Sequence, residues 1–281
     1  MLTVLDVVKR TTEFFEQRGI ESARLNAELL IGHALTLKRM QLYLQFERPL
    51  TEPELERIRP LVKRRGGREP LQYITGEAAF GDLLLKVDKR VLIPRPETEQ
   101  LVELVLAQRA TSPASVLDLG TGSGAIALAL AKAWPETKVT AVDRSKEALE
   151  LARENTATAG LTDRVHFAES DWFAGLSAGG RYEVIVANPP YLSDEEVAEA
   201  QPEVREHEPK GALSAGRDSA ADLQKIIAEA PRWLAPGGLL ALETGIGQHA
   251  QLLAAAKAAG FARTESRRDL AGRDRFVLAF L

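Results

Sequence analysis

The residues best suited to chemistry in this sequence are Asn188, Pro189, Pro190 and Tyr191, which follow an apolar run at positions 184–187. Proline cannot donate to a sheet ladder, so two prolines in succession predict that a strand ends here in a stiff turn. The side chain of Asn188 supplies one carbonyl, and the backbone carbonyl of Pro189 is left free because Pro190 has no N–H. Two fixed acceptors of this kind can hold both N–H bonds of a planar amide or amine.

Such a turn can prepare a weak nucleophile for group transfer. The nitrogen of an amide or aromatic amine is a poor nucleophile because its lone pair is delocalised, so an enzyme must aim it. The ring of Tyr191 can lie against the flat face of the group. In-line transfer from a sulfonium then needs positioning, with no nucleophilic side chain or metal. We therefore predict Asn188, Pro189 and Tyr191 as catalytic residues; the alternative is a plain turn, because Asn-Pro often starts one.

A glycine-rich loop precedes this turn in the chain. Gly120, Gly122 and Gly124 lie between the strand-like "SVLDL" and the helix-like "AIALALA". Residues without a Cβ let the backbone approach a ligand, and the following helix offers free N–H groups. The pattern predicts a nucleoside cofactor. It does not say which one, because Gly120, Gly122 and Ala125 also satisfy a dinucleotide fingerprint, and a purely structural turn is a further alternative.

The next two strand-like runs end in residues that suit the same cofactor. Asp143 ends "KVTAVD", where its carboxylate can accept the two hydroxyls of a ribose or instead cap the helix that begins near Ser145. Asp171 and Trp172 end the third run, where the ring can pack on a base and the carboxylate can accept from its amine. The alternative for Trp172 is a place in the core.

These motifs lie in an α/β region preceded by helices. Apolar residues recur at intervals of three and four in the N-terminal part, which predicts a helical domain over residues 1–75, with Thr51 and Glu54 as cap and first-turn residues of one helix. Strand-like runs on either side of Gly81-Asp82 predict a β-hairpin linker over residues 76–95. Strand-like and helical runs alternate through residues 96–281, which predicts a doubly wound α/β sheet with ligands beyond the carboxyl ends of its strands.

Composition narrows the classes of function. The chain has 281 residues, of which 45% are hydrophobic and 27% charged, and its formal charge is -4. It has no cysteine, which excludes disulfides and a cysteine nucleophile, and its four histidines lack metal-ligand spacing, so we expect no metal. No run is apolar enough to span a bilayer, so we expect no membrane partner, and the lack of cysteine fits a cytoplasmic enzyme. We expect the basic run at positions 63–68 to be a solvated loop.

The sequence resembles the class I S-adenosylmethionine-dependent methyltransferases, and within them the peptide chain release factor glutamine methyltransferases, the HemK/PrmC group. The likeness covers nearly the whole chain. It rests on "DLGTGSGAIA", "NPPY", "QYITGEAAFG", "VLIPRPETEQLVE" and the tail "DLAGRDRFV". The chain departs from the group at Ser219, where glycine is common, and at Thr244, where an aliphatic residue is usual. Both positions lie outside the "NPPY" turn.

The resemblance implies a Rossmann-like methyltransferase domain and an N-terminal domain that helps to grip the substrate. It implies S-adenosyl-L-methionine as the cofactor, S-adenosyl-L-homocysteine as its product, and no metal. The implied substrate is the glutamine in the Gly-Gly-Gln loop of peptide chain release factors, methylated on its side-chain nitrogen. The implied cofactor-binding residues are Gly120, Thr121, Gly122, Ser123, Gly124, Asp143, Trp172 and Asn188. The implied substrate-binding residues are Asn188, Pro189, Pro190 and Tyr191, with positions 95–99 framing the entrance.

Two alternatives remain open at this point. Enzymes that methylate the exocyclic amine of adenine in DNA or RNA use the same tetrapeptide, with the aromatic ring stacked on a flipped base. Such enzymes need a basic surface, whereas residues 1–90 carry only a small basic excess and the remainder is net negative, so a nucleic acid partner is not expected. The other alternative is a nonenzymatic partner of the translation machinery with a vestigial site.

Overall fold

The computed structural model describes residues 1–109, 111–177 and 179–281. The chain divides into two compact units. The first comprises Met1–Glu77 with Gln201–His207, and the second comprises Ala78–Ala200 with Glu208–Leu281. The first boundary lies close to the predicted end of the helical domain at residue 75. The residues of the predicted linker, apart from the first two, fall within the second unit.

The first unit is helical. Its elements are α1 (Val4–Glu16), α2 (Ala23–Leu35), α3 (Arg39–Tyr43), α4 (Glu52–Gly66), α5 (Leu71–Thr75) and α10 (Pro202–His207). The prediction for Thr51 and Glu54 is confirmed, because Thr51 is the N-cap of α4 and its backbone N–H donates to the carboxylate of Glu54 in the first turn. The core of the unit joins α1, α2 and α4 through buried residues that include Val8, Ile31 and Ile58.

The basic run at the end of α4 is partly buried in the first unit. Arg65 is only 5% exposed, and its Nη2 lies 2.9 Å from Oε1 of Glu203 in α10. Nη2 of Arg68 lies 2.6 Å from the other carboxylate oxygen of Glu203. The expectation that this run is a solvated loop is therefore wrong for these two arginines. A buried guanidinium requires a partner, and this one comes from a distant part of the sequence, beyond the reach of any local pattern.

The second unit contains the predicted α/β sheet. Its strands are β1 (Glu77–Phe80), β2 (Leu83–Lys86), β3 (Ser115–Leu119), β4 (Lys138–Asp143), β5 (Val165–Glu169), β6 (Tyr182–Ala187), β7 (Leu234–Glu243), β8 (Arg263–Arg268) and β9 (Asp274–Phe280). Its helices are α6 (Pro96–Ala107), α7 (Ala125–Ala133), α8 (Lys146–Thr158), α9 (Asp194–Glu199), α11 (Lys210–Leu213), α12 (Ala221–Glu229), the 3-10 helix η1 (Ala230–Arg232) and α13 (His249–Ala258). Within the described ranges, no helix combines the length and apolar character of a membrane span.

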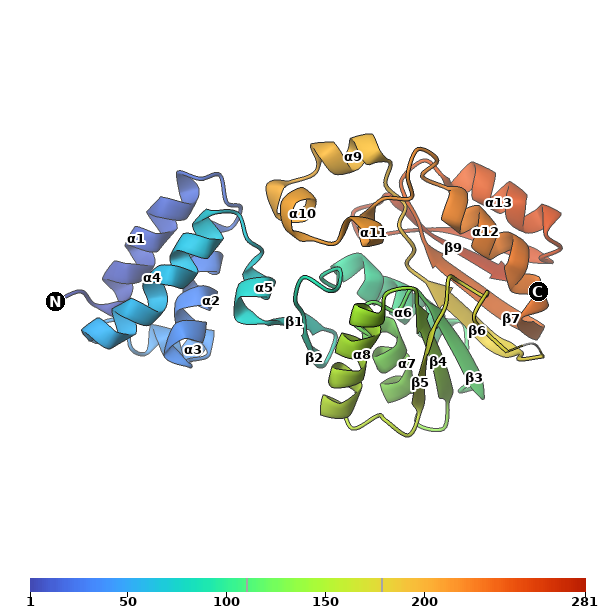
Figure 1. The fold of residues 1–281 in the computed structure, drawn as a ribbon, viewed down its shortest axis with the longest axis horizontal. Coiled ribbons are helices and arrows are strands. Elements are labelled where there is room, and N and C mark those ends of the chain that lie inside the picture. The colour runs from blue at the N-terminus through green and yellow to red at the C-terminus, as the bar shows by residue number, and fades with distance from the viewer. Residues whose placement is uncertain (110, 178) are drawn as a thin grey trace. The chain divides into compact units, whose positions relative to one another are not determined.

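The main sheet, as described, has seven strands in the order β5-β4-β3-β6-β7-β9-β8. The pairs among β5, β4, β3, β6 and β7 are parallel, and β9 runs antiparallel to both its neighbours. Buried residues of α6 and α7 cover one face and those of α12 and α13 cover the other (Figure 1). The strand order reverses at β3, so the carboxyl ends of β3, β4 and β6 meet where a doubly wound sheet binds its ligand.

The smaller two-stranded sheet is the hairpin that the sequence predicts. β1 and β2 pair with each other, and Gly81 adopts a φ of +56° in the turn between them. Apolar residues of both strands, among them Phe80 and Leu85, belong to the same buried cluster as α6 and α7. The hairpin therefore packs as part of the second unit.

Candidate active site

A cavity of the second unit gathers residues from the carboxyl ends of four parallel strands. Its lining includes Gly120, Thr121, Gly122 and Ser123 after β3, Asp143 after β4, Asp171 and Trp172 after β5, and Asn188 and Pro190 after β6. Arg90, Arg95, Thr98, Pro209, Gly211 and Ala212 complete it, together with further residues of the same loops. Three predicted site residues, Gly124, Pro189 and Tyr191, are not in the lining.

The glycine loop needs its glycines for conformation. Gly120, Gly122 and Gly124 have φ angles of +72°, +53° and +85°, in the left-handed region that other residues rarely adopt. A Cβ at position 122 would meet no protein atom within 4 Å, so the backbone there faces open space in the cavity. A Cβ at position 124 would instead lie 3.4 Å from that of Ala152 in α8. A contact of this length is ordinary, so Gly124 is required by its positive φ, whereas Gly122 also allows close approach of a ligand.

Asp143 braces this loop from the neighbouring strand. Its Oδ2 accepts a hydrogen bond of 2.9 Å from the N–H of Gly122, and its Oδ1 accepts one of 2.9 Å from the N–H of Ser145. The helix cap is Ser145, whose hydroxyl accepts from the N–H of Ala148. Each carboxylate oxygen can accept a second hydrogen bond, so Asp143 retains the capacity to hold two hydroxyls in the cavity.

Beneath the loop lies a carboxyl group that sequence reasoning missed. Asp118 is the last residue but one of β3 and is fully buried. Its Oδ2 accepts from the hydroxyl of Thr121 at 2.7 Å and from the N–H of Ala127 at 3.2 Å. Among the described residues its Oδ1 has no hydrogen-bond partner. Burial raises the pKa of Asp118 to about 7, and the negative charge of Asp143 adds to the rise.

Trp172 belongs to both the core and the cavity wall. It is 8% exposed and packs in a buried cluster with Phe173 and the residues of α12. Its Nε1 donates to Oδ1 of Asp222 at 3.1 Å, and its ring lies against Gly120. A φ of +52° is unusual for a bulky residue and turns the side chain back over the loop. Asp171 beside it is exposed and pairs with Lys225 at 3.1 Å.

The "NPPY" turn is tied to α6 and β7 by a chain of hydrogen bonds. Nδ2 of Asn188 lies 3.0 Å from Oγ1 of Thr98, and that hydroxyl donates to Oε2 of Glu243 at 2.7 Å. The hydroxyl of Tyr191 donates to the other oxygen of Glu243 at 3.0 Å. Glu243 is 1% exposed, and burial raises its pKa. Asn188 and Tyr191 are thus joined through one buried carboxyl group.

The side chain of Tyr191 is partly buried and does not line the cavity, unlike a residue that stacks on a ligand in an open pocket. Burial raises its pKa, and the charge of Glu243 raises it further. The guanidinium of Arg275 lies 5.5 Å from the centre of its ring. Its packing and its bond to Glu243 hold the ring in a fixed orientation behind the turn. That this ring contacts the substrate stays a prediction.

Arg95 of the cavity lining is held by a buried carboxylate outside that lining. Glu208 is 5% exposed and accepts from Nη2 of Arg95 and from the N–H of Ile93, at 2.5 and 3.2 Å. Burial raises the pKa of Glu208, and Arg95 opposes that rise. On the neighbouring stretch of wall, Arg144 donates to the carbonyl of Gly211 at 2.8 Å. These bonds hold the segment before α6 and the loops that carry Arg144 and Gly211.

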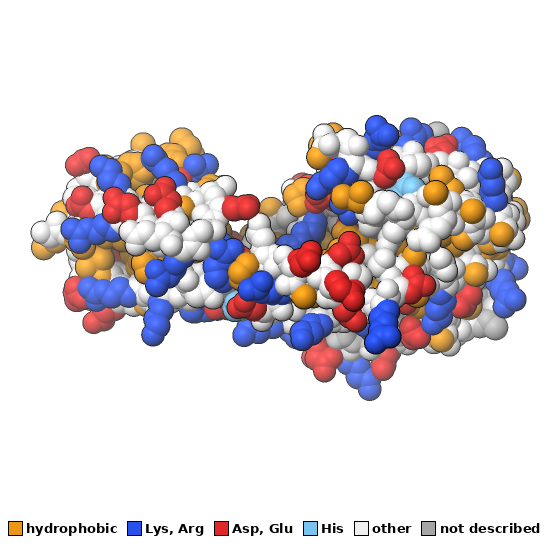
Figure 2. Space-filling model, turned by 90° about the horizontal axis from the view of Figure 1, so that it is seen from above, with side chains coloured by type: hydrophobic (Ala, Val, Ile, Leu, Met, Phe, Trp, Pro, Cys, Tyr) orange, Lys and Arg blue, Asp and Glu red, His pale blue; other side chains and the backbone are white. Residues whose placement is uncertain are grey.

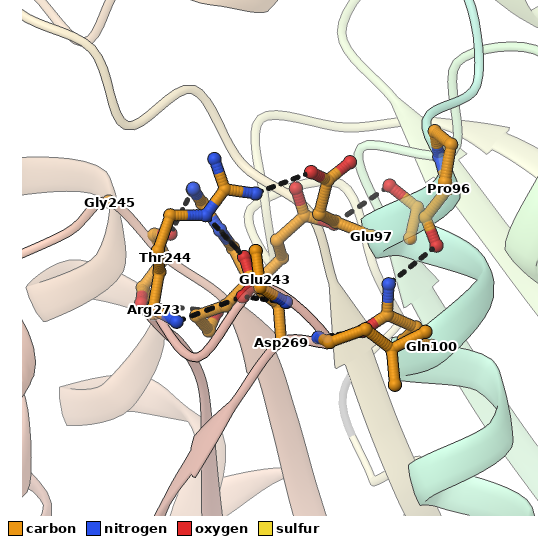
Figure 3. A network of polar contacts seen from close by, with 12 residues as sticks. Pro96, Glu97, Gln100, Glu243, Thr244, Gly245, Asp269 and Arg273 are labelled. Carbon is orange, nitrogen blue, oxygen red and sulfur yellow. Dashed lines mark hydrogen bonds and ion pairs between the residues drawn. The ribbon is translucent and has the colours of Figure 1, made fainter.

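The first turn of α6 is braced from the other side by the turn between β8 and β9. Arg273 pairs with Glu97 at 2.9 Å and with Asp269 at 2.7 Å (Figure 3). Oε1 of Gln100 accepts from the N–H of Leu270 at 3.0 Å. This network joins two of the segments that carry the family resemblance, "IPRPETE" and "DLAGRDR". Thr98 lies in the braced turn.

Sequence reasoning missed Thr98, Glu243 and Asp118 as site residues. Thr98 lies in the segment "IPRPETE", where nothing in the sequence distinguishes the role of one residue from that of the next. Glu243 and Asp118 offered a signal, because each is a carboxylate at the end of an apolar strand, where an ionisable side chain is costly unless it has partners.

Comparison with known proteins assigns this arrangement to a class. Residues 6–76 match the family model described as the PrmC N-terminal domain, and residues 110–266 match that of a methyltransferase domain. Among solved structures, the fold is similar to a methyltransferase from Pyrococcus furiosus, with a TM-score of 0.53 and 19% identity over 72% of this chain and 90% of that one. It is also similar to the 16S rRNA N2 G1207 methyltransferase of T. thermophilus, with a TM-score of 0.53 and 17% identity over 73% of this chain and 49% of that one. Fold and site together define a methyltransferase.

Curated relatives narrow the class to a family. The chain is 44% identical to the release factor glutamine methyltransferase of Chlorobaculum tepidum over 86% of this chain and 85% of that one. It is 42% identical to the enzyme of the same name from Geobacter sulfurreducens, over 98% and 95% of the two chains. The chain belongs to the release factor glutamine methyltransferase family.

Proposed function

We propose that this protein methylates the side-chain nitrogen of the glutamine in the Gly-Gly-Gln loop of peptide chain release factors, with S-adenosyl-L-methionine as methyl donor. The observation that carries the proposal is the position of Asn188. Its amide nitrogen is held by Thr98 while the residue lines a cavity that also contains the glycine loop and Asp143. Family membership supports the same substrate, because the curated relatives bear this name.

The residues of the cavity fit the proposed donor. The carboxylate of Asp143 would hold the ribose hydroxyls, and the open backbone at Gly122 would allow the nucleoside to approach. The ring of Trp172 would cover the base from the far side of the loop. When bound, S-adenosyl-L-methionine supplies a methyl group on a positively charged sulfur. Among the described residues there is no group of three or more His, Asp or Glu that could hold a metal.

The role of the turn in the reaction is to orient a planar amide. The side-chain carbonyl of Asn188 and the backbone carbonyl of Pro189 would accept the two N–H bonds of the substrate glutamine. The glutamine nitrogen would take the methyl group from the bound donor, whose sulfur would keep the electron pair of the broken carbon–sulfur bond. One amide proton would pass to water, which would leave methylglutamine and S-adenosyl-L-homocysteine. Orientation of the reacting atoms supplies much of the acceleration, because positioned reactants avoid an entropic cost.

The proposal also places the protein in the cytoplasm, where release factors act. On the face shown in Figure 2, Lys and Arg side chains are interspersed with Asp and Glu over both units. This mixture is unlike the continuous basic surface that phosphate recognition requires. The helical first unit would contribute to binding of the protein substrate.

The test is methyl transfer from labelled S-adenosyl-L-methionine to three acceptors side by side. These are a purified release factor, its Gln→Ala loop variant and a DNA duplex. We expect label on the intact release factor alone. Label on the DNA alone would overturn the proposal in favour of an adenine amine methyltransferase. Absence of label on every acceptor, together with no binding of the donor in calorimetry, would favour a nonenzymatic role.

A further inference from the structure

We propose that Thr98 and Glu243 are positioning residues that fix the direction in which the amide of Asn188 points, with its nitrogen toward α6 and its oxygen toward the cavity. The proposal rests on the proposed function, because it explains how the turn distinguishes a substrate amide from a carboxylate. An asparagine amide carries two donors on one side and an acceptor on the other, and a rotation of 180° exchanges them with little change in shape. Something must therefore select one orientation.

The orientation of the Asn188 amide follows from the number of protons available along the hydrogen bonds that join Asn188, Thr98 and Glu243. An ionised Glu243 can only accept, and it accepts from the hydroxyls of Thr98 at 2.7 Å and Tyr191 at 3.0 Å. Thr98 has a single hydroxyl proton, which is used on Glu243. Its oxygen, 3.0 Å from Asn188, can then only accept, so the group it faces must be the Asn188 NH₂. The carbonyl oxygen of Asn188 is left for the cavity.

The position of Thr98 is fixed independently of Asn188. It lies in the first turn of α6 and is 5% exposed. The flanking Glu97 is paired with Arg273, and Gln100 accepts from the backbone of Leu270 (Figure 3). Because these contacts anchor the turn, the hydroxyl of Thr98 is a fixed reference point and not a mobile side chain that follows Asn188.

The charge of Glu243 is set by groups on three elements. Burial raises its pKa, and Glu97 of α6 adds to the rise. The hydroxyls of Thr98 and Tyr191 and the guanidinium of Arg275 on β9 lower it. Protonated Glu243 could donate to Thr98, which would free the threonine proton to point at Asn188. The direction of the chain therefore depends on an ionised Glu243.

The consequence is discrimination between glutamine and glutamate in the substrate loop. With its oxygen in the cavity, Asn188 accepts from a substrate N–H and repels a substrate carboxylate. In a Thr98→Val variant the valine methyl has no preference for either side of the amide. Asn188 could then turn its NH₂ to a carboxylate, so the variant should tolerate glutamate. In a Glu243→Gln variant the new amide can donate to Thr98, so the same relaxation should occur in part.

The experiment compares the affinity of the enzyme for a release factor with its natural Gly-Gly-Gln loop and for its Gln→Glu variant. Affinity is measured by calorimetry with S-adenosyl-L-homocysteine present, and kcat is measured on the natural substrate. We expect Thr98→Val to reduce the glutamine-over-glutamate preference by about tenfold or more and to lower kcat by about 10- to 100-fold, as for loss of one oriented polar contact. The dissociation constant of the donor should stay within about threefold, because Asp143 and the glycine loop are untouched.

Two variants separate positioning from packing. Thr98→Ser keeps the hydroxyl and should restore most of the preference. Thr137→Val makes the same chemical change at another buried threonine, whose hydroxyl donates to the carbonyl of Pro113 at 2.6 Å, away from the cavity lining. It should lower the thermal midpoint and leave the preference unchanged.

The two proposals fail in different ways. If the wild-type enzyme does not methylate the natural loop, the proposed function fails. If the wild type is active and Thr98→Val retains the full preference for glutamine, the inference is overturned. A loss of preference in Thr137→Val equal to that in Thr98→Val would also overturn it, because general destabilisation would then explain both.

Discussion

The hydroxyl of Thr121, in the glycine loop, donates a 2.7 Å hydrogen bond to the fully buried carboxyl group of Asp118. The loop that faces the cavity is thus anchored to an ionisable group that water cannot reach. Burial raises the pKa of this carboxyl to about 7 from a usual value of 3.8. The folded protein therefore keeps the proton of Asp118 at pH values where the unfolded chain has lost it.

This relation predicts a pH dependence of stability. Between about pH 4 and 7 the folded state binds the extra proton, so the free energy of unfolding should fall as pH rises, with a slope of up to about 1.4 kcal/mol per pH unit from this group. Above pH 7 both states are ionised and the contribution becomes constant. Asp118→Asn mimics the protonated form and should remove this component. Urea unfolding of both proteins at several pH values measures it, and parallel curves would show that Asp118 is not the group responsible.

Asn188→Ala should slow methyl transfer while cofactor binding persists. The side chain presents an acceptor that acts on the substrate in the transition state, so we expect kcat to fall by about 10²- to 10³-fold. Single-turnover kinetics with labelled donor measure the rate, and calorimetry measures donor affinity. An unimpaired rate would contradict the role of the turn.

Asp143→Ala should weaken donor binding. The carboxylate provides the acceptors for the ribose and also holds the N–H of Gly122, so its loss should cost about 1–3 kcal/mol of binding free energy. Asp82→Ala is the matched control, because that carboxylate is exposed, paired with Lys132 and outside the cavity lining. Calorimetric titration with S-adenosyl-L-homocysteine compares the two. Equal affinities for wild type and Asp143→Ala would exclude the ribose contact.

Glu203→Ala should destabilise the first unit strongly. Removal of this carboxylate leaves Arg65 buried without its ion pair, which should cost about 3–5 kcal/mol. Glu52→Ala removes the partner of Arg59 at the surface of α4, where both side chains are about 60% exposed, and should cost no more than about 1 kcal/mol. The loss of stability in the two variants can be measured by urea unfolding, monitored by the circular dichroism of the helices, or by hydrogen exchange in α4. Similar losses of unfolding free energy in both variants would show that the buried ion pair contributes no more to stability than the exposed one.

Much of the fold could be predicted because its signals are local. The strands that carry the cavity residues are short apolar runs: β4 ends at Asp143, and β6 ends at Ala187, directly before Asn188. β8 was beyond prediction, because "RTESRR" has no alternation of apolar residues and is a strand only by pairing with β9. The short helices α9, α10 and α11 lie on the chain after the "NPPY" turn and are too brief to show a helical period.

The sequence by itself determined which residues follow the strand ends, since glycine, proline and the run of apolar residues act through local backbone geometry. The sequence was therefore sufficient to place the glycine loop, Asp143 and Asn188 at the strand ends. Only the tertiary structure decided what each side chain bonds to. Glu243 meets Thr98 across 145 positions of sequence, and Glu203 meets Arg68 across 135. Buried polar groups must find partners wherever the fold brings them, and no local pattern records that choice.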